Sequence, residues 1–195
     1  MSNLIFLDRS FEKEFLKILI HQKIDLIVTS NFIYKRRCYE DIKNIVDYAP
    51  VRSHRIKREL TLDAVDQVLS DVHFERLLFV GGGRLIDFFK LVCARRNAKL
   101  FVILMNISND GFVSGCSALP KSEGRKFVTI ESKKPEIVYV FNQLLKKMPE
   151  DFILSGLGEA IAKLQVLEDL RFEYTPLWIQ EKFRIPLAPL YKFLF

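Results

Sequence analysis

The segment from residue 77 to residue 105 constrains the fold more than any other part of the sequence. An apolar run at residues 77–80 is followed by Gly81, Gly82 and Gly83, an apolar helical pattern at residues 84–95, and a second apolar run at residues 99–105. Neither run alternates with polar residues, which is typical of strands that are buried on both faces of a parallel sheet. The segment therefore predicts a strand, a tight turn, a helix and a parallel strand.

The rest of the chain continues this alternation of strands and helices. Apolar spacing predicts helices at residues 10–22, 35–48 and 61–69, and strands at 24–29, 49–51, 126–131 and 137–140. From Pro149 onward the chain has a helical pattern. We expect an α/β, Rossmann-like fold with a mostly parallel sheet and helices on both faces. Residues 1–148 are predicted to form a nucleotide-binding domain, and residues 149–195 a truncated helical appendage.

The three glycines are the strongest candidate for a ligand site. Glycine adopts positive φ and lets a ligand approach the backbone, and a helix N-terminus offers free N–H groups to a pyrophosphate. Arg84 begins the helix, and Asp87 in its first turn can accept hydrogen bonds from loop amides. The sequence GGGRLI is neither GxGxxG nor a P-loop, so a plain turn between strand and helix stays an alternative. If the loop binds phosphate, valine at Gly82 is expected to block the ligand.

A polar loop follows the second apolar strand. It carries short donors and acceptors that suit sugar hydroxyls or an amide: Asn106, Ser108, Asn109, Asp110, Gly111 and Ser114. In an open α/β sheet this loop faces the same crevice as the glycine turn, because ligands bind at the carboxyl ends of the strands. The alternative is a polar turn built on Asn-Asp-Gly chemistry.

Charge and composition limit the kinds of partner that the chain is expected to bind. Thirty basic residues face 24 acidic ones, but the basic clusters at residues 35–37 and 52–58 are short and lack interleaved aromatics, which argues against nucleic acid. Two interpretations of the positive charge remain: a solvated basic face, or a site that attracts a phosphorylated small molecule. The basic residues 52–55 favour a 2′-phosphate or another anion over a bare ribose. We expect no membrane span and no signal peptide, and three cysteines without a CxxC motif suggest a reduced, cytoplasmic protein.

The stretch FVGGGRLIDFFKLVCARRNAKLFVILMNISNDGFVSGCSAL resembles the glycerol-1-phosphate dehydrogenase group, which shares its fold with 3-dehydroquinate synthase and the iron-containing alcohol dehydrogenases. The family motifs correspond to the three glycines with Asp87 and Lys90, to the box at residues 108–114, to the strand at 135–140 and to the helix SGLGEAIAKLQVLEDL. The resemblance implies an NAD(P)-dependent oxidoreductase acting on a polyol phosphate. It implies that Gly81, Gly82, Gly83, Arg84 and Asp87 form the pyrophosphate site. Asn106 and Ser108 would lie along the cofactor, Ser114 near the nicotinamide, Asp110 at a substrate hydroxyl, and Glu159 as a ligand of Zn²⁺ or Fe²⁺.

The metal site departs from this family pattern. The family adds two histidine ligands from a longer helical domain, but His21, His54 and His73 all precede the glycine loop, and Asn109 replaces the histidine of the box. Three hypotheses stay open: an oxidoreductase whose missing ligands come from elsewhere, a non-catalytic nucleotide-binding module, and a partner-binding structural subunit. The aromatic C-terminal tail, residues 171–195, either covers the fold or forms a homo- or hetero-oligomer interface.

Overall fold

The computed structural model describes residues 3–56, 60–122 and 126–171. The chain divides into two compact units, residues 1–156 and residues 157–195. The first unit is a layered α/β domain. The second unit is described only through the last part of helix α6 (Glu150–Arg171). None of the described helices is both long enough and apolar enough to cross a membrane.

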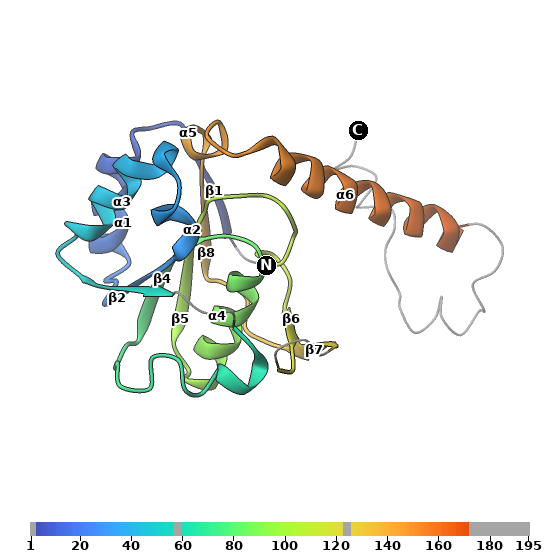
Figure 1. The fold of residues 1–195 in the computed structure, drawn as a ribbon, viewed down its shortest axis with the longest axis horizontal. Helices are drawn as coiled ribbons and strands as arrows, with labels where there is room; N and C mark the ends of the chain where they lie inside the picture. Colours follow the sequence, from blue (N-terminus) through green and yellow to red (C-terminus); the bar gives the residue numbers. More distant parts are fainter. Residues whose placement is uncertain (1–2, 57–59, 123–125, 172–195) are drawn as a thin grey trace. The chain divides into compact units, whose positions relative to one another are not determined.

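A six-stranded parallel sheet forms the centre of the first unit (Figure 1). Its strand order is β1-β8-β5-β4-β2-β3, and every neighbouring pair runs parallel. The strands are β1 (Asn3–Leu7), β2 (Leu26–Ser30), β3 (Arg52–Ile56), β4 (Arg76–Gly81), β5 (Lys99–Leu104) and β8 (Ile137–Phe141). The direction of winding reverses between β2 and β4, because β3 lies outside β2 whereas β5 and β8 follow β4 on the other side.

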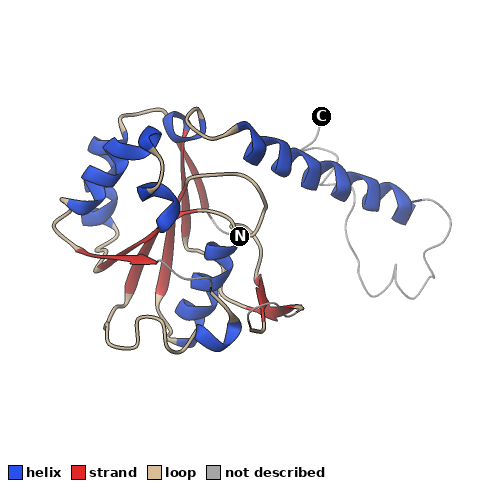
Figure 2. Ribbon diagram, viewed as in Figure 1, coloured by secondary structure: helices blue, strands red, loops and turns tan. Residues whose placement is uncertain are grey.

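Helices cover both faces of this sheet (Figure 2), as the apolar strands predict. On one face, α1 (Phe11–His21), α2 (Asn31–Tyr34) and α3 (Glu40–Asp47) share a core with Leu78 and Val80 of β4. On the opposite face, α4 (Arg84–Arg95) packs with Leu77 and Phe79. Consecutive residues of β4 therefore enter different cores, since successive side chains of a strand point to opposite faces. The predicted α/β, Rossmann-like class is confirmed.

A small antiparallel sheet lies in the sequence between β5 and β8. It consists of β6 (Cys116–Pro120) and β7 (Phe127–Glu131), and β6 packs on α4. The Ser117 hydroxyl donates a hydrogen bond of 2.7 Å to the Asp87 carbonyl. This contact anchors the small sheet to the helix that follows the glycines. After β8 the chain forms the short helix α5 (Asn142–Leu145) and enters α6.

Several predicted elements need correction. The helix predicted at 35–48 is a 3₁₀ turn, η1 (Arg37–Tyr39), followed by α3, and the strand predicted at 49–51 lies instead at β3. The helix predicted at 61–69 is a 3₁₀ turn, η2 (Leu62–Ala64), followed by turns, and Leu69 has a φ of +62° that ends any right-handed helix. Strands β1 and β6 were not predicted. The proposed domain boundary at 148/149 stays a prediction, and the two compact units divide inside α6.

Candidate functional site

The reversal of winding lies between β2 and β4, which are neighbours in the sheet. In open α/β sheets with this 2-1-3-4-5 type of order, ligands bind where the connections from two neighbouring strands diverge. Thr29 of β2 pairs in register with Val80 of β4, so β2 ends beside the glycine turn. The candidate site therefore contains the turn after β2, residues 81–84 and the loop after β5.

The glycine turn has the geometry that the sequence predicts. Gly83 is the N-cap of α4 with φ +62° and ψ −145°, a region that essentially only glycine adopts. A Cβ built on Gly83 would meet only the Ser108 hydroxyl, at 3.9 Å. Within the described ranges, the amides of Arg84 and Leu85 donate to no backbone or side-chain acceptor. The start of α4 thus offers N–H donors and the positive end of the helix dipole.

Gly82 has a packing role that the sequence did not indicate. A Cβ on this residue would lie 2.5 Å from Asn106 Nδ2, so the absence of a side chain at Gly82 makes room for the Asn106 side chain. Asn106 is buried, and its Oδ1 accepts a hydrogen bond of 3.0 Å from the Ser108 hydroxyl. Valine at Gly82 would also displace Asn106, so the expectation that it blocks a ligand stays a prediction, to which the loss of this packing is added.

A second glycine, Gly156, packs closely against the main chain of residues 107–108. A Cβ on Gly156, near the start of α6, would lie 2.1 Å from the Ile107 carbonyl oxygen. The neighbouring Ser155 hydroxyl donates to the Ser108 carbonyl at 3.3 Å. Residues 106–108 consequently lie between the Gly82 and Gly156 backbones.

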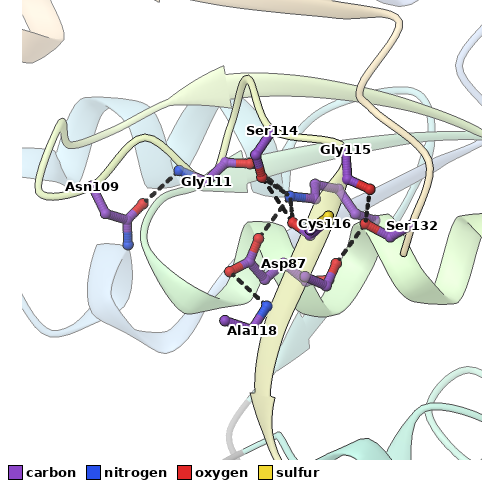
Figure 3. Close-up of polar contacts among 10 residues, drawn as sticks. Asp87, Asn109, Gly111, Ser114, Gly115, Cys116, Ala118 and Ser132 are labelled. Carbon is purple, nitrogen blue, oxygen red and sulfur yellow. Dashed lines mark hydrogen bonds and ion pairs between the residues drawn. The ribbon is translucent and has the colours of Figure 1, made fainter. Parts of the chain in front are cut away.

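A buried ammonium group organises the rest of the polar loop (Figure 3). Lys90 of α4 is fully buried, and its Nζ donates to Asp87 Oδ1 at 2.8 Å, to the Gly111 carbonyl at 2.8 Å, to Ser114 Oγ at 3.0 Å and to the Cys116 carbonyl. Two of these acceptors are main-chain carbonyls from the two ends of residues 111–116. The ammonium therefore fixes that segment to α4.

This network uses two of the predicted cofactor residues. The Asp87 carboxylate bonds Lys90 and accepts the Ala118 amide at 3.3 Å, and the Ser114 hydroxyl donates to the Cys116 carbonyl at 2.8 Å. The contacts that the structure shows for Asp87 go to Lys90 and the small sheet, not to glycine-turn amides. Asn109 Oδ1 accepts the Gly111 amide at 3.2 Å, and the Asp110 carbonyl accepts the Val113 amide at 3.0 Å. The loop is thus a structured turn that presents its polar residues next to α4.

Near the carboxyl end of β3, the Arg55 side chain contacts two residues of α2. Asn31 Oδ1 accepts two N–H groups of Arg55, one of them Nε at 3.0 Å, and the guanidinium carbon lies 4.1 Å from the centre of the Tyr34 ring. The Tyr34 hydroxyl donates to Asp47, and burial followed by this hydrogen bond raises the pKa of Tyr34. The sequence pointed to residues 52–55 through charge alone and missed Asn31 and Tyr34 as the partners of Arg55.

The metal assignment finds no support in the described residues. Glu159 lies in the second unit, where its carboxylate pairs with Lys163 Nζ at 2.9 Å. Residues 3–56, 60–122 and 126–171 contain no group of three or more His, Cys, Asp or Glu side chains arranged to hold a metal ion. Catalytic zinc takes about three protein ligands. The described residues therefore do not fit a metal centre.

A parallel sheet with helices on both faces, and with a glycine turn and a free helix N-terminus at the point of reversal, defines the class of open, doubly wound α/β folds, which bind ligands at this point. The comparison with known families narrows this class: the family model for iron-containing alcohol dehydrogenase matches residues 12–149. The chain belongs to this family.

The relatives are glycerol-1-phosphate dehydrogenases. The chain is 30% identical over 149 residues to glycerol-1-phosphate dehydrogenase [NAD(P)+] of Saccharolobus islandicus (strain L.S.2.15 / Lassen #1), with 75% of this chain and 42% of the relative covered. It is 29% identical over 109 residues to the protein of the same name from Methanospirillum hungatei JF-1, covering 56% and 29%. The chain thus spans less than half the length of these relatives.

Solved structures show the same fold. A probable glycerol dehydrogenase from Sinorhizobium meliloti 1021 superposes with a TM-score of 0.68 at 18% identity, covering 82% of this chain and 44% of that one. A sulfoacetaldehyde reductase from Bifidobacterium kashiwanohense, in complex with NAD+, gives a TM-score of 0.62 at 14% identity, covering 77% and 47%.

Proposed function

We propose that this chain binds a nicotinamide dinucleotide, NAD or NADP, with its pyrophosphate against residues 81–84. The observation that carries the proposal is the Gly83 turn, which lies at the reversal of winding and leaves helix N–H donors open. When bound, the nicotinamide exchanges a hydride with the carbon of an alcohol or carbonyl substrate. The family and its relatives support a role in a polyol-phosphate oxidoreductase.

The loop after β5 serves this site in two ways. Asn106 and Ser108 lie next to Gly82 and Gly83 and are proposed to follow the cofactor, with Asp110 addressing a substrate hydroxyl. Asp87 and Ser114 are proposed to act indirectly, because both bond the Lys90 ammonium that fixes the loop. A non-catalytic nucleotide-binding module is the second candidate, favoured by the poor fit of the described residues to a metal centre.

Isothermal calorimetry of the full chain with NADPH and with NADH tests the proposal. We expect micromolar binding, and at least tenfold weaker binding by Gly83→Val, since a branched side chain there has both a disfavoured φ and no room beside a phosphate. Gly158→Ala is the matched control, because a Cβ on Gly158 meets no described atom within 4 Å. Failure of the unmodified chain to bind either dinucleotide would reject the proposal, and unchanged affinity in Gly83→Val would remove the turn from the site.

Turnover separates the two candidates. Oxidation of glycerol 1-phosphate by the full chain, with metal content measured on the same sample, would support the oxidoreductase. Dinucleotide binding with neither turnover nor metal would support the binding module.

A further inference from the structure

A second, basic cleft lies at the opposite end of β4 from the glycine turn. Its volume is about 420 Å³, and its lining includes His73, Phe74 and Glu75 before β4, Arg76 at the start of β4, and Arg96 and Lys99 around the start of β5. Because β4 runs from Arg76 to Gly81, the two sites are separated by roughly 17 Å along the strand. The cleft is therefore outside the proposed dinucleotide site.

Main-chain carbonyls and aromatic rings hold both guanidinium groups of the cleft. Arg96 donates to the carbonyls of Leu69 at 2.7 Å, Val72 at 3.2 Å and Val68 at 3.1 Å, and its guanidinium carbon lies 5.2 Å from the Phe74 ring centre. Arg76 donates through Nε to the Gln22 carbonyl and lies 5.4 Å from the Phe101 ring centre.

These contacts leave donors unused. An arginine has five N–H donors, so the contacts of Arg76 occupy one and those of Arg96 at most three. Both side chains are thus preorganised and still have hydrogen bonds to offer.

The charges around the cleft are predominantly positive. Lys99 is exposed, and its ammonium bonds no acceptor in the part of the chain that the structure describes. Glu75 is the single acidic residue of the lining, and the nearby Asp25 carboxylate is already engaged by the Glu75 and Arg76 amides at 2.8 and 3.2 Å. Arg52 adds a further cation, since it donates to the His73 carbonyl at 2.7 Å.

We propose that this cleft is a second anion site, which binds the phosphate or diphosphate group of a small molecule. Fixed guanidiniums match the geometry of phosphate oxygens, and a concave, positively charged wall raises the local concentration of anions. The volume admits a diphosphate with a small attached group and falls in the range of small-molecule sites. The inference does not depend on the proposed dinucleotide site, because none of its residues belongs to that site.

The test is a titration of the ¹⁵N-labelled full chain with inorganic pyrophosphate at constant ionic strength, followed by NMR. Saturable shifts of the Glu75, Asn97 and Lys99 amides are expected, and Lys99→Gln should weaken this binding about fivefold. Lys13→Gln, which removes an exposed charge on α1, is the matched control and should bind as the unmodified chain does.

The outcomes distinguish the two sites. Saturable shifts confined to residues 82–85 would show that pyrophosphate binds only the glycine turn and would overturn the second site. Equal affinity in Lys99→Gln and Lys13→Gln would do the same. Binding at the cleft in a Gly83→Val chain that no longer binds NADPH would support it independently of the proposed function.

Discussion

Substitution of Lys90 by methionine should destabilise the domain severely. Methionine keeps most of the side-chain length but removes the ammonium, which leaves the Asp87 carboxylate and the Gly111 and Cys116 carbonyls without their shared donor. Lys90 is fully buried and the Asp87 side chain is 11% exposed, so water replaces little of the lost interaction. Removing one partner of a buried ion pair typically costs about 3–5 kcal/mol.

Urea unfolding followed by circular dichroism measures this cost. Since small domains have a total stability of about 5–15 kcal/mol, the loss should move the midpoint by a large fraction of its value. Lys163→Met is the matched control: its pair with Glu159 is 51% and 33% exposed, and its loss should cost less than about 1 kcal/mol.

A double substitution separates the ion pair from packing. In Lys90→Met/Asp87→Asn the uncompensated carboxylate is also gone, so the combined cost should be smaller than the sum of the two single costs. A cost for Lys90→Met no greater than that for Lys163→Met would refute the view that the buried ammonium holds the loop. Strict additivity in the double variant would refute the coupling to Asp87.

Three further outcomes follow from the structure. Gly156→Ala should lose about 1–3 kcal/mol in urea unfolding because its Cβ would meet the Ile107 carbonyl at 2.1 Å, whereas Gly158→Ala in the same helix should gain up to about 1 kcal/mol; equal effects would contradict the close approach. Burial raises the pKa of the Cys93 thiol to about 12 from 9.0, so between pH 9 and pH 12 the thiol ionises in the unfolded chain but not in the folded one. The free energy of unfolding should therefore fall as the pH rises through this range, by up to about 1.4 kcal/mol per pH unit more than it falls in Cys93→Ala. Glu159→Gln should leave the metal content by mass spectrometry unchanged, and a clear loss of stoichiometric zinc would show that ligands beyond the described residues complete a site.

The central strands could be predicted from the sequence because strands buried on both faces are continuous apolar runs. Residues 77–80 and 100–105 have no polar alternation, and the structure buries them between two helical layers. The edge strand β1 gave no such pattern: four of its five residues are exposed, and its place depends on pairing with β8, for example Asn3 with Ile137. Local propensity carries little information about a partner so distant in the chain.

The glycine turn was predictable from the local sequence, whereas the burial of Lys90 was only partly predictable. Three glycines between a strand and a helix restrict the backbone to few conformations, and Gly83 adopts one of them. Lys90 follows Asp87 by three residues in an otherwise apolar helix, a spacing that also occurs on solvated helix faces. Its other acceptors, the Gly111 and Cys116 carbonyls, lie more than twenty residues further along the chain. The periodicity of a helix says nothing about contacts with so distant a segment.

The close packing of Gly82 and Gly156 against residues 106–108 has a mechanical consequence. The contact of Gly156 is with main-chain atoms of Ile107, so a small movement of Gly156 is not absorbed by a change of rotamer, and on the other side the buried Asn106 side chain fills the space beside Gly82. A displacement of the first turns of α6 would push the Ile107 backbone, and through Asn106 it would reach the turn that begins α4. The position of the first turns of α6 and the occupancy of the glycine turn should therefore influence one another through this packing.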